Sequence, residues 1–172
     1  MTAPTVELRP FTRAEYHAFY ADYVADPVMD PNFYHYSRDR VDRCFDLEQS
    51  RRAWYPVFGI FLPDGECVGS LALKRIDPMD RRCEIGITMK DNGCKNHGYG
   101  TQAMREAIRM ASEVYGVRHI YADTMGGNRR MQHILDKLGF RFLERIPHAY
   151  DMHDRWEDKL NYVLEVPPCE KS

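Results

Sequence analysis

The sequence predicts an α+β fold of three layers, in which helices flank a mixed, mostly antiparallel sheet of about six or seven strands. Two observations lead to this fold class. Short apolar runs separated by turn residues occur in the middle and at the end of the chain. A strand, an amphipathic helix and a second strand follow one another between those runs, and such a crossover joins two parallel strands.

The composition predicts a single domain over residues 1–172, with a core from about 6 to 166. The chain is 44% hydrophobic and holds 8 Phe and 11 Tyr residues, which suffices for one substantial core. Its 24 basic and 26 acidic residues nearly balance, so we expect a small partner and no nucleic acid. No run approaches the roughly 18 apolar residues of a membrane span. We therefore expect a cytoplasmic protein without a membrane partner, either a monomer or a homodimer.

The cysteines and histidines give no metal site. The five cysteines form no C-x-x-C pair, and their odd number leaves one over in any disulfide scheme, so reduced thiols are expected. His148 and His153 lie in a polar, turn-like region without a third ligand at a familiar spacing. We expect no bound metal.

The N-terminal elements follow from alternation and capping. Residues 6–8 alternate apolar and polar side chains, and Pro10 ends this short strand. Thr12 and Glu15 form the capping-box pattern of a helix over 12–25.

A loop with two prolines and several aromatic residues is expected over 27–36, and a polar helix over 37–51 follows it. Phe33, Tyr34 and Tyr36 could wall a pocket or could simply pack on the core.

The remaining elements alternate with clear turn signals. Apolar runs over 54–62, 67–76 and 83–89 are joined by the turns PDGE and DPMD, which predicts an antiparallel meander. The elements expected after it are an amphipathic helix over 101–115, a strand over 117–124, a helix over 131–138, and two strands over 140–146 and 159–166. Gly116 and Gly139 stop the two helices.

Two glycines stand directly before the helix that begins at about residue 101, in the stretch KNHGYG. Glycines let successive backbone N–H groups point into one concavity, and the helix adds the positive end of its dipole. Such a place binds phosphate. Lys95 would add charge at the rim and Thr101 a hydroxyl, whereas a plain tight turn is the alternative.

Known nucleotide loops do not fit this stretch. The third glycine of the dinucleotide fingerprint is replaced by Ala103, and the G-K-[ST] of a Walker A loop is missing. An adenine-nucleotide binder of another kind stays as an alternative.

The stretch KNHGYG resembles the acetyl-CoA loop of the GNAT N-acetyltransferases, [RQ]-x-x-G-x-[GA], with Lys in the first place. CEIGI at residues 83–87 resembles the strand before that loop, and NRRMQHILDKLGF at residues 128–140 resembles the family's N-x-x-[SA]…G-F helix. DKLNYVL at residues 158–164 is similar to the closing strand of the branch that acetylates ribosomal-protein N-termini and related amines. The resemblance runs from about residue 6 to residue 166.

The resemblance implies acetyl-CoA as co-substrate and a protein N-terminus, a polyamine or another small amine as acceptor. Main-chain amides would hold the pyrophosphate at Lys95, Asn96, His97, Gly98, Tyr99, Gly100 and Thr101. Backbone groups would bind the pantetheine arm and the thioester at Ile87, Thr88 and Met89. Asn128 would hydrogen-bond near the pantetheine, and its residue type also fits a helix N-cap.

Glu84 and Tyr150 are the candidate catalytic residues. An amine must lose a proton to attack a thioester, and Glu84 on the strand beside the expected thioester is the first candidate for the base. Its alternative is a structural ion pair with Arg81, Arg82 or Lys74. Leu135 stands where many members of the family have a tyrosine acid, so Tyr150, Tyr121 and solvent are the candidates for the acid.

Several departures from the family pattern bear on function. Met131 replaces a common Ser or Ala, and Asn92-Gly93-Cys94 replaces a loop that usually holds an aromatic residue, so weaker coenzyme affinity is expected. Cys94 is either a reactive thiol or a buried, inert side chain. A non-catalytic acyl-CoA-binding or regulatory domain is therefore the main alternative. The N-terminal acidic residues could form an acceptor pocket or a solvated face: Asp30, Asp39, Asp42, Asp46 and Glu48.

Overall fold

The computed structural model describes residues 5–168. The strands are β1 (Glu7–Arg9), β2 (Val57–Phe61), β3 (Cys67–Asp77), β4 (Arg82–Met89), β5 (His119–Met125), β6 (Arg141–Asp151) and β7 (Trp156–Glu165). The helices are α1 (Arg13–Asp22), α2 (Arg38–Ser50), α3 (Tyr99–Glu113) and α4 (Arg129–Lys137).

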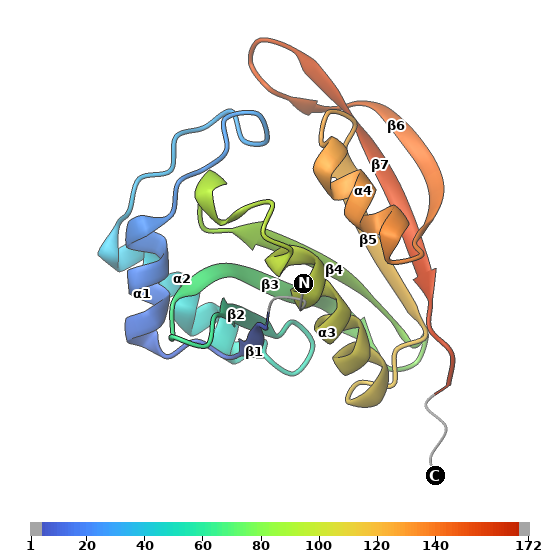
Figure 1. The fold of residues 1–172 in the computed structure, drawn as a ribbon, viewed down its shortest axis with the longest axis horizontal. Coiled ribbons are helices and arrows are strands. Elements are labelled where there is room, and N and C mark those ends of the chain that lie inside the picture. The colour runs from blue at the N-terminus through green and yellow to red at the C-terminus, as the bar shows by residue number, and fades with distance from the viewer. Residues whose placement is uncertain (1–4, 169–172) are drawn as a thin grey trace.

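The strands form one seven-stranded sheet in the order β1-β2-β3-β4-β5-β7-β6 (Figure 1). The crossover through α3 makes β4 and β5 parallel, and every other neighbouring pair in the described sheet is antiparallel. The predicted fold class, a mixed and mostly antiparallel sheet between helices, is therefore confirmed.

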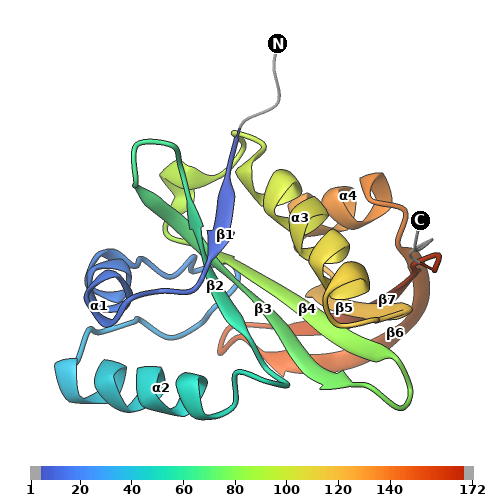
Figure 2. The same ribbon diagram turned by 90° about the horizontal axis from the view of Figure 1, so that it is seen from below.

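Helices cover both faces of the sheet, as Figure 2 shows. On one face α1 and α2 enclose an aromatic cluster of Phe11, Tyr16, Phe19, Val41, Phe45 and Phe61. On the other face α3 and α4 pack on the main core through their small and aliphatic residues. The fully buried residues of these two helices follow the 3.6-residue period. They are Ala103, Met104, Ala107, Ala111 and Leu135.

The first helix begins as predicted and ends early. The side chain of Thr12 accepts a hydrogen bond from the Glu15 amide and Glu15 accepts one from the Thr12 amide, so the capping box is confirmed. The helix ends at Asp22 instead of Ala25, because the backbone becomes extended at Tyr23 and the Val24 amide donates a hydrogen bond to the Lys90 carbonyl at 3.0 Å. A tertiary hydrogen bond thus replaces the last helical turn.

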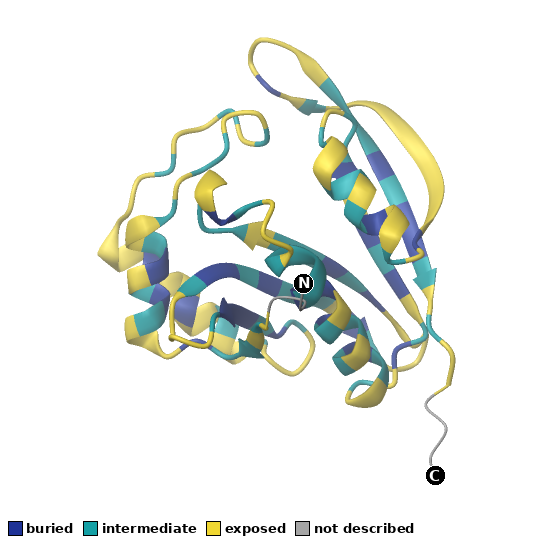
Figure 3. Cartoon of the chain, viewed as in Figure 1, coloured by how far each residue is buried: buried dark blue, intermediate teal, exposed yellow. Residues whose placement is uncertain are grey.

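Several strand boundaries also differ from the prediction, and β7 begins at Trp156 instead of residue 159. Strand β2 begins at Val57 and not at residue 54, because the amides of Trp54 and Tyr55 fold back to the Arg51 carbonyl in a turn. Strand β6 continues to Asp151, so the region that reads as polar and turn-like belongs to a long β6–β7 hairpin. Nearly every residue of β6 is exposed (Figure 3), which removes the hydrophobic alternation that would have identified it.

Candidate functional site

The two central strands separate after a short parallel contact. β4 and β5 pair only from Arg82–Glu84 to His119–Tyr121, although β4 stays paired with β3 as far as Met89. β5 continues through Met125 with β7 as its partner. The β4 edge beyond Glu84 therefore faces the opening without a strand partner (Figure 1), and its backbone polar groups can bind a ligand.

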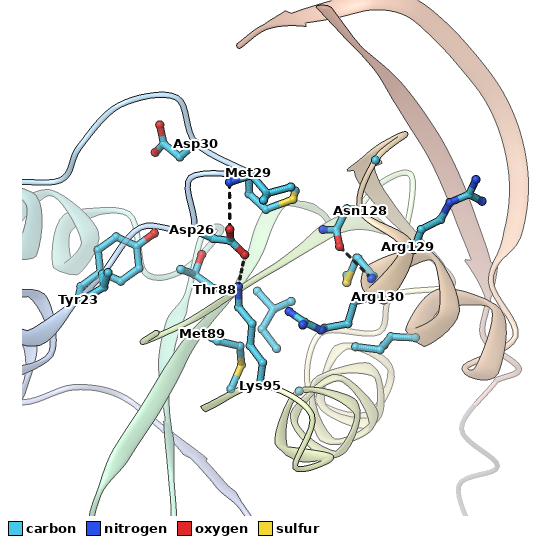
Figure 4. A pocket seen from close by; sticks show the side chains of 17 residues that line it. Tyr23, Asp26, Met29, Asp30, Thr88, Met89, Lys95, Asn128, Arg129 and Arg130 are labelled. Atoms are coloured by element: carbon cyan, nitrogen blue, oxygen red, sulfur yellow. Dashed lines mark hydrogen bonds and ion pairs between the residues drawn. The ribbon is translucent and has the colours of Figure 1, made fainter. Parts of the chain in front are cut away.

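A cavity of about 540 Å³ lies at this opening (Figure 4). Its lining from β4 and α3 is Ile87, Thr88, Met89 and Gly100; from α4 and the turn before it, Gly127, Asn128, Arg129, Arg130, Met131 and Ile134. The segment after α1 and Lys95 complete the wall. The volume and the mixture of apolar and polar groups are typical of a small-molecule site.

The N-terminus of α3 is built to leave backbone amides free. Gly98 is its N-cap, with φ +82°, a left-handed conformation that glycine adopts without strain. Gly98 has no side chain to cap the helix, so the amides at the N-cap and at Tyr99, Gly100 and Thr101 have no intrahelical acceptor. Those amides and the positive end of the helix dipole make an anion site.

Gly100 brings this anion site to the cavity. A Cβ added there would lie 3.6 Å from Ile87 Cδ1 and 3.8 Å from Met89 Sδ, in space that the cavity occupies. The loop and the β4 edge thus meet at one place, as the resemblance implies.

The other side chains of the loop point elsewhere. Asn96, at φ +64°, accepts a hydrogen bond from Arg130 Nε at 3.0 Å. His97 Nε2 lies 2.9 Å from the Gly93 carbonyl, and its ring stacks on Tyr99 at 5.3 Å. None of Asn96, His97, Gly98, Tyr99 and Thr101 lines the cavity. Any contact they make with an anion there would come from their backbone amides.

Lys95 does not offer a free charge at the rim. Its ammonium lies 2.6 Å from Asp26 and donates to Asn92 Oδ1 at 2.7 Å. Arg130 is the cationic residue that the sequence reasoning missed; it lines the cavity from α4 and reaches across to Asn96. The signal was the Arg129-Arg130 pair just after Asn128, in the first turn of a helix that faces the loop.

Asn128 is the N-cap of α4. Its Oδ1 accepts a hydrogen bond from the Met131 amide at 3.1 Å, so the capping role is confirmed. The same side chain lines the cavity, where its amide group could also reach a ligand. One residue can therefore serve the helix and the site together.

The two roles of Asn128 can be separated by two substitutions. Asn128→Ser keeps a capping oxygen, whereas Asn128→Ala removes it and should lower the free energy of unfolding by about 1 kcal/mol. Both variants lose the amide group. If that group contacts the coenzyme, calorimetry should give both the same weakened affinity, while chemical denaturation separates them. Wild-type affinity in the serine variant would limit Asn128 to capping.

Glu84 lies on the opposite face of the sheet from α3, at the point where β4 and β5 separate. It lines a second cavity, of about 520 Å³, with Tyr121 and Asp123. Its carboxylate is 36% exposed and pairs with Arg75 at 3.1 Å. The expected alternative partners Arg81, Arg82 and Lys74 were wrong.

A β-bulge explains why Arg75 was missed. Lys74 is opposite Glu84 in the register, so Arg75 would point to the other face of a regular strand. The register shifts between Lys74 and Asp77, and Arg75 takes a positive φ of 51°, which redirects its side chain. Lys74 instead passes over Gly86, where an added Cβ would lie 2.8 Å from Nζ.

The candidate acids lie on the same side as Glu84. Tyr150 donates to Asp123 Oδ2 at 3.0 Å, and burial together with the charge of Asp123 raises the pKa of the Tyr150 hydroxyl. Tyr150 therefore stays protonated at neutral pH, although it lines neither cavity. Tyr121 does line the second cavity, and Leu135 is fully buried.

Two of the five N-terminal acidic residues, Asp42 and Asp46, belong to ion pairs. Asp42 and Asp46 are bound by Arg13, and Asp42 also contacts His17. Asp30 differs from them because it lines the first cavity. Glu48 accepts a hydrogen bond from the Tyr16 hydroxyl at 2.8 Å, and burial raises the pKa of its carboxyl.

The aromatic loop contributes its aliphatic residues to the cavity. Val28 and Met29 line it, whereas Tyr34 packs on Tyr23 with ring centroids 5.2 Å apart. Phe33 is 88% exposed. Tyr34 also lines a smaller cavity of about 180 Å³ beside α2, so it both packs on another aromatic ring and walls a pocket.

The thiol of Cys94 was a candidate reactive group. Cys94 is buried, and burial raises the pKa of its thiol, so it fits an inert side chain better than a reactive thiol.

Within residues 5–168, no three His, Cys, Asp or Glu side chains are grouped to hold a metal ion. No helix in that range is long and apolar enough to cross a membrane.

Known proteins resemble this chain in sequence family and in fold. The model of the "Acetyltransferase (GNAT) domain" family matches residues 5–141. Among solved structures, a probable acetyltransferase is similar with a TM-score of 0.81, at 18% identity over 93% of this chain and 92% of that one. A spermidine N-acetyltransferase from Vibrio cholerae, in complex with CoA and spermine, gives a TM-score of 0.82 at 14% identity, over 93% and 95% of the two chains. Among curated proteins, none matches this sequence.

At such low identity, the structural similarity shows the fold, whereas the family model covers most of the 172 residues. Strands β4 and β5 separate beyond Glu84, Gly98 begins α3, and Asn128 caps α4. The chain belongs to the GNAT family of acetyltransferases.

Proposed function

We propose that the protein transfers the acetyl group of acetyl-CoA to a primary amine of a protein N-terminus, a polyamine or another small molecule. The observation that carries this proposal is the cavity lined by Gly100 at the start of α3, by α4 and by the free edge of β4, beside the helix N-terminus whose amides have no intrahelical acceptor. Such a cavity can hold a long ligand that is anionic at one end and amide-bearing along its length. Acetyl-CoA has this chemistry.

The residues present fit the coenzyme. The amides from Gly98 to Thr101 would accept the pyrophosphate, with Arg130 adding a positive charge from α4. The β4 edge at Ile87–Met89 would pair with the amides of the pantetheine arm and would hold the thioester near the point where the strands separate. Backbone N–H groups there would stabilise the oxyanion that forms on attack.

The acceptor amine would approach from the second cavity, on the opposite face of the sheet. Its nitrogen would attack the carbonyl carbon of the thioester directly, the C–S bond would break, and coenzyme A would leave as a thiol. Glu84 would take a proton from the amine, because it lies where the strands separate. The hydroxyl group of Tyr150 or Tyr121 could donate a proton to the departing thiolate.

The experiment combines binding with turnover. A melting temperature that rises with acetyl-CoA would support coenzyme binding, since a ligand at about 100 times its Kd stabilises the folded state by about 2.7 kcal/mol. Release of free thiol with a panel of amines and peptides would then support acetyl transfer. An unchanged melting temperature at saturating acetyl-CoA would contradict the proposal.

Two observations favour a second function. Arg75 holds the Glu84 carboxylate, and the residue at the usual tyrosine position is the fully buried Leu135. A non-catalytic acyl-CoA-binding domain needs neither a base nor an acid. Stabilisation by acetyl-CoA without thiol release from any amine would favour this alternative.

The reduced cysteines support a cytosolic location, which we also propose. The four described residues Cys44, Cys67, Cys83 and Cys94 carry free thiols, and Cys169 lies outside the described residues.

A further inference from the structure

The segment after α1 forms one wall of the first cavity. Its lining residues are Tyr23, Val24, Asp26, Val28, Met29 and Asp30, here called the wall segment. The segment belongs to neither a helix nor a strand. It is fixed to the chain before α3 by the hydrogen bond from Val24 to Lys90 and by the ion pair between Asp26 and Lys95.

The Asp26–Lys95 pair is well shielded from solvent. Only 18% of the Asp26 side chain and 13% of the Lys95 side chain are exposed, and Oδ2 lies 2.6 Å from Nζ. The hydrogen bond from Lys95 lowers the pKa of Asp26, so the carboxylate is ionised at neutral pH. Figure 4 shows Lys95 extending from the loop to Asp26 in the cavity wall.

A carboxylate in this wall conflicts with the ligand that we propose for the cavity. Coenzyme A carries several phosphate charges, and like charges repel more strongly where water is partly excluded. Lys95 neutralises Asp26 at the place where the two would meet. Its second hydrogen bond, to Asn92, holds the ammonium in that position.

We infer that Lys95 is a positioning residue, which cancels the charge of Asp26 and anchors the wall segment and does not itself bind the pyrophosphate. The inference rests on the proposed function. It also accounts for the lysine at the first loop position, where the family pattern has Arg or Gln. Arg130, which donates to Asn96 in the same loop, is then the cation nearest the phosphates.

Two roles for Lys95 predict different results for a double substitution. If Lys95 binds phosphate, Lys95→Met and the double variant lose the same contact and bind coenzyme A equally weakly. If Lys95 neutralises Asp26, Lys95→Met leaves in the wall a carboxylate without its ion-pair partner, held by the hydrogen bond from the Val28 amide. Adding Asp26→Asn removes that negative charge. Coenzyme A affinity should then return.

The test is titration calorimetry with coenzyme A on the wild type, Lys95→Met, Asp26→Asn and the double variant. We expect Lys95→Met to weaken coenzyme A binding about tenfold or more. The affinities of Asp26→Asn and of the double variant should stay within about threefold of the wild type. Lys90→Met is the matched control, because it removes a similarly shielded lysine from a 2.8 Å pair with Glu66 that does not line the cavity. It should leave the affinity unchanged.

The outcomes separate this inference from the proposed function. A double variant as weak as Lys95→Met would overturn the neutralising role while wild-type binding still supported the coenzyme site. A wild type that does not bind coenzyme A would overturn both. Melting curves without ligand establish that each variant is folded, and Lys95→Gln provides a second neutral substitution that should behave as Lys95→Met does.

Discussion

Replacing Gly98 with valine is expected to weaken coenzyme A binding about tenfold or more. Gly98 caps α3 at φ +82°, and a β-branched residue is strained in this left-handed conformation. Relief of the strain would turn the amides of Gly98, Tyr99 and Gly100 away from the anion that they are proposed to hold. Calorimetry with coenzyme A measures the loss directly.

Gly65 supplies the control for backbone strain. It has φ +90° in the turn between β2 and β3, with no atom within 4 Å of an added Cβ. Gly65→Val should lower the free energy of unfolding by about 1–2 kcal/mol and leave coenzyme affinity unchanged. Equal affinity in Gly98→Val and the wild type would show that the α3 amides do not bind the pyrophosphate.

Glu84→Gln is expected to lower turnover about a hundredfold while coenzyme affinity stays the same. Glutamine has nearly the same shape as glutamate but cannot accept the proton of the attacking amine. The side chain lies at the strand separation on the face opposite α3 and does not line the first cavity, so coenzyme binding should not depend on it. Thiol release with a verified amine, measured across pH, checks the effect.

Arg75 allows the base to be distinguished from a structural ion pair. Arg75→Met breaks the 3.1 Å contact but keeps the Glu84 carboxylate. If Glu84 is the base, this variant should keep most of its turnover. Comparable losses of turnover in Arg75→Met and Glu84→Gln would instead indicate that the ion pair has a structural role.

Local patterns in the sequence predicted most of the fold. The capping box of α1, the apolar stripe of α3 and the turns of the meander each follow from short-range chemistry, and each is present. Strand β6 was predicted to end early, because its exposed residues carry no alternation between polar and apolar side chains. The end of α1 was missed because a tertiary hydrogen bond to Lys90 decides it.

The candidate site also contains features that the sequence predicted and contacts that it did not. The glycine turn before α3, strand β4 and the N-cap at Asn128 could be predicted because they depend on backbone conformation and on order along the chain. The partners of Lys95 and Glu84 could not. Asp26 is 69 residues from Lys95, and Arg75 reaches Glu84 only because of a bulge, so neither contact leaves a signal in spacing.

Under the proposed function the acceptor would enter the second cavity, whose charges are mixed. Four carboxylates line it with three basic residues and two tyrosines, namely Asp77, Glu84, Asp123 and Glu144; Arg75, Arg82 and Lys159; Tyr121 and Tyr162. Acids and bases in such proximity favour an acceptor that carries polar groups besides its amine. A panel for the thiol-release assay should therefore contain short peptides as well as polyamines.

Hydrogen exchange with and without coenzyme A tests the central claim most directly, because the claim concerns particular backbone amides. Bound coenzyme should slow exchange at Gly98–Thr101 and along the free β4 edge at Ile87–Met89, while the exposed β6 strand stays unchanged. Saturating coenzyme A that slows exchange at neither segment would contradict the account.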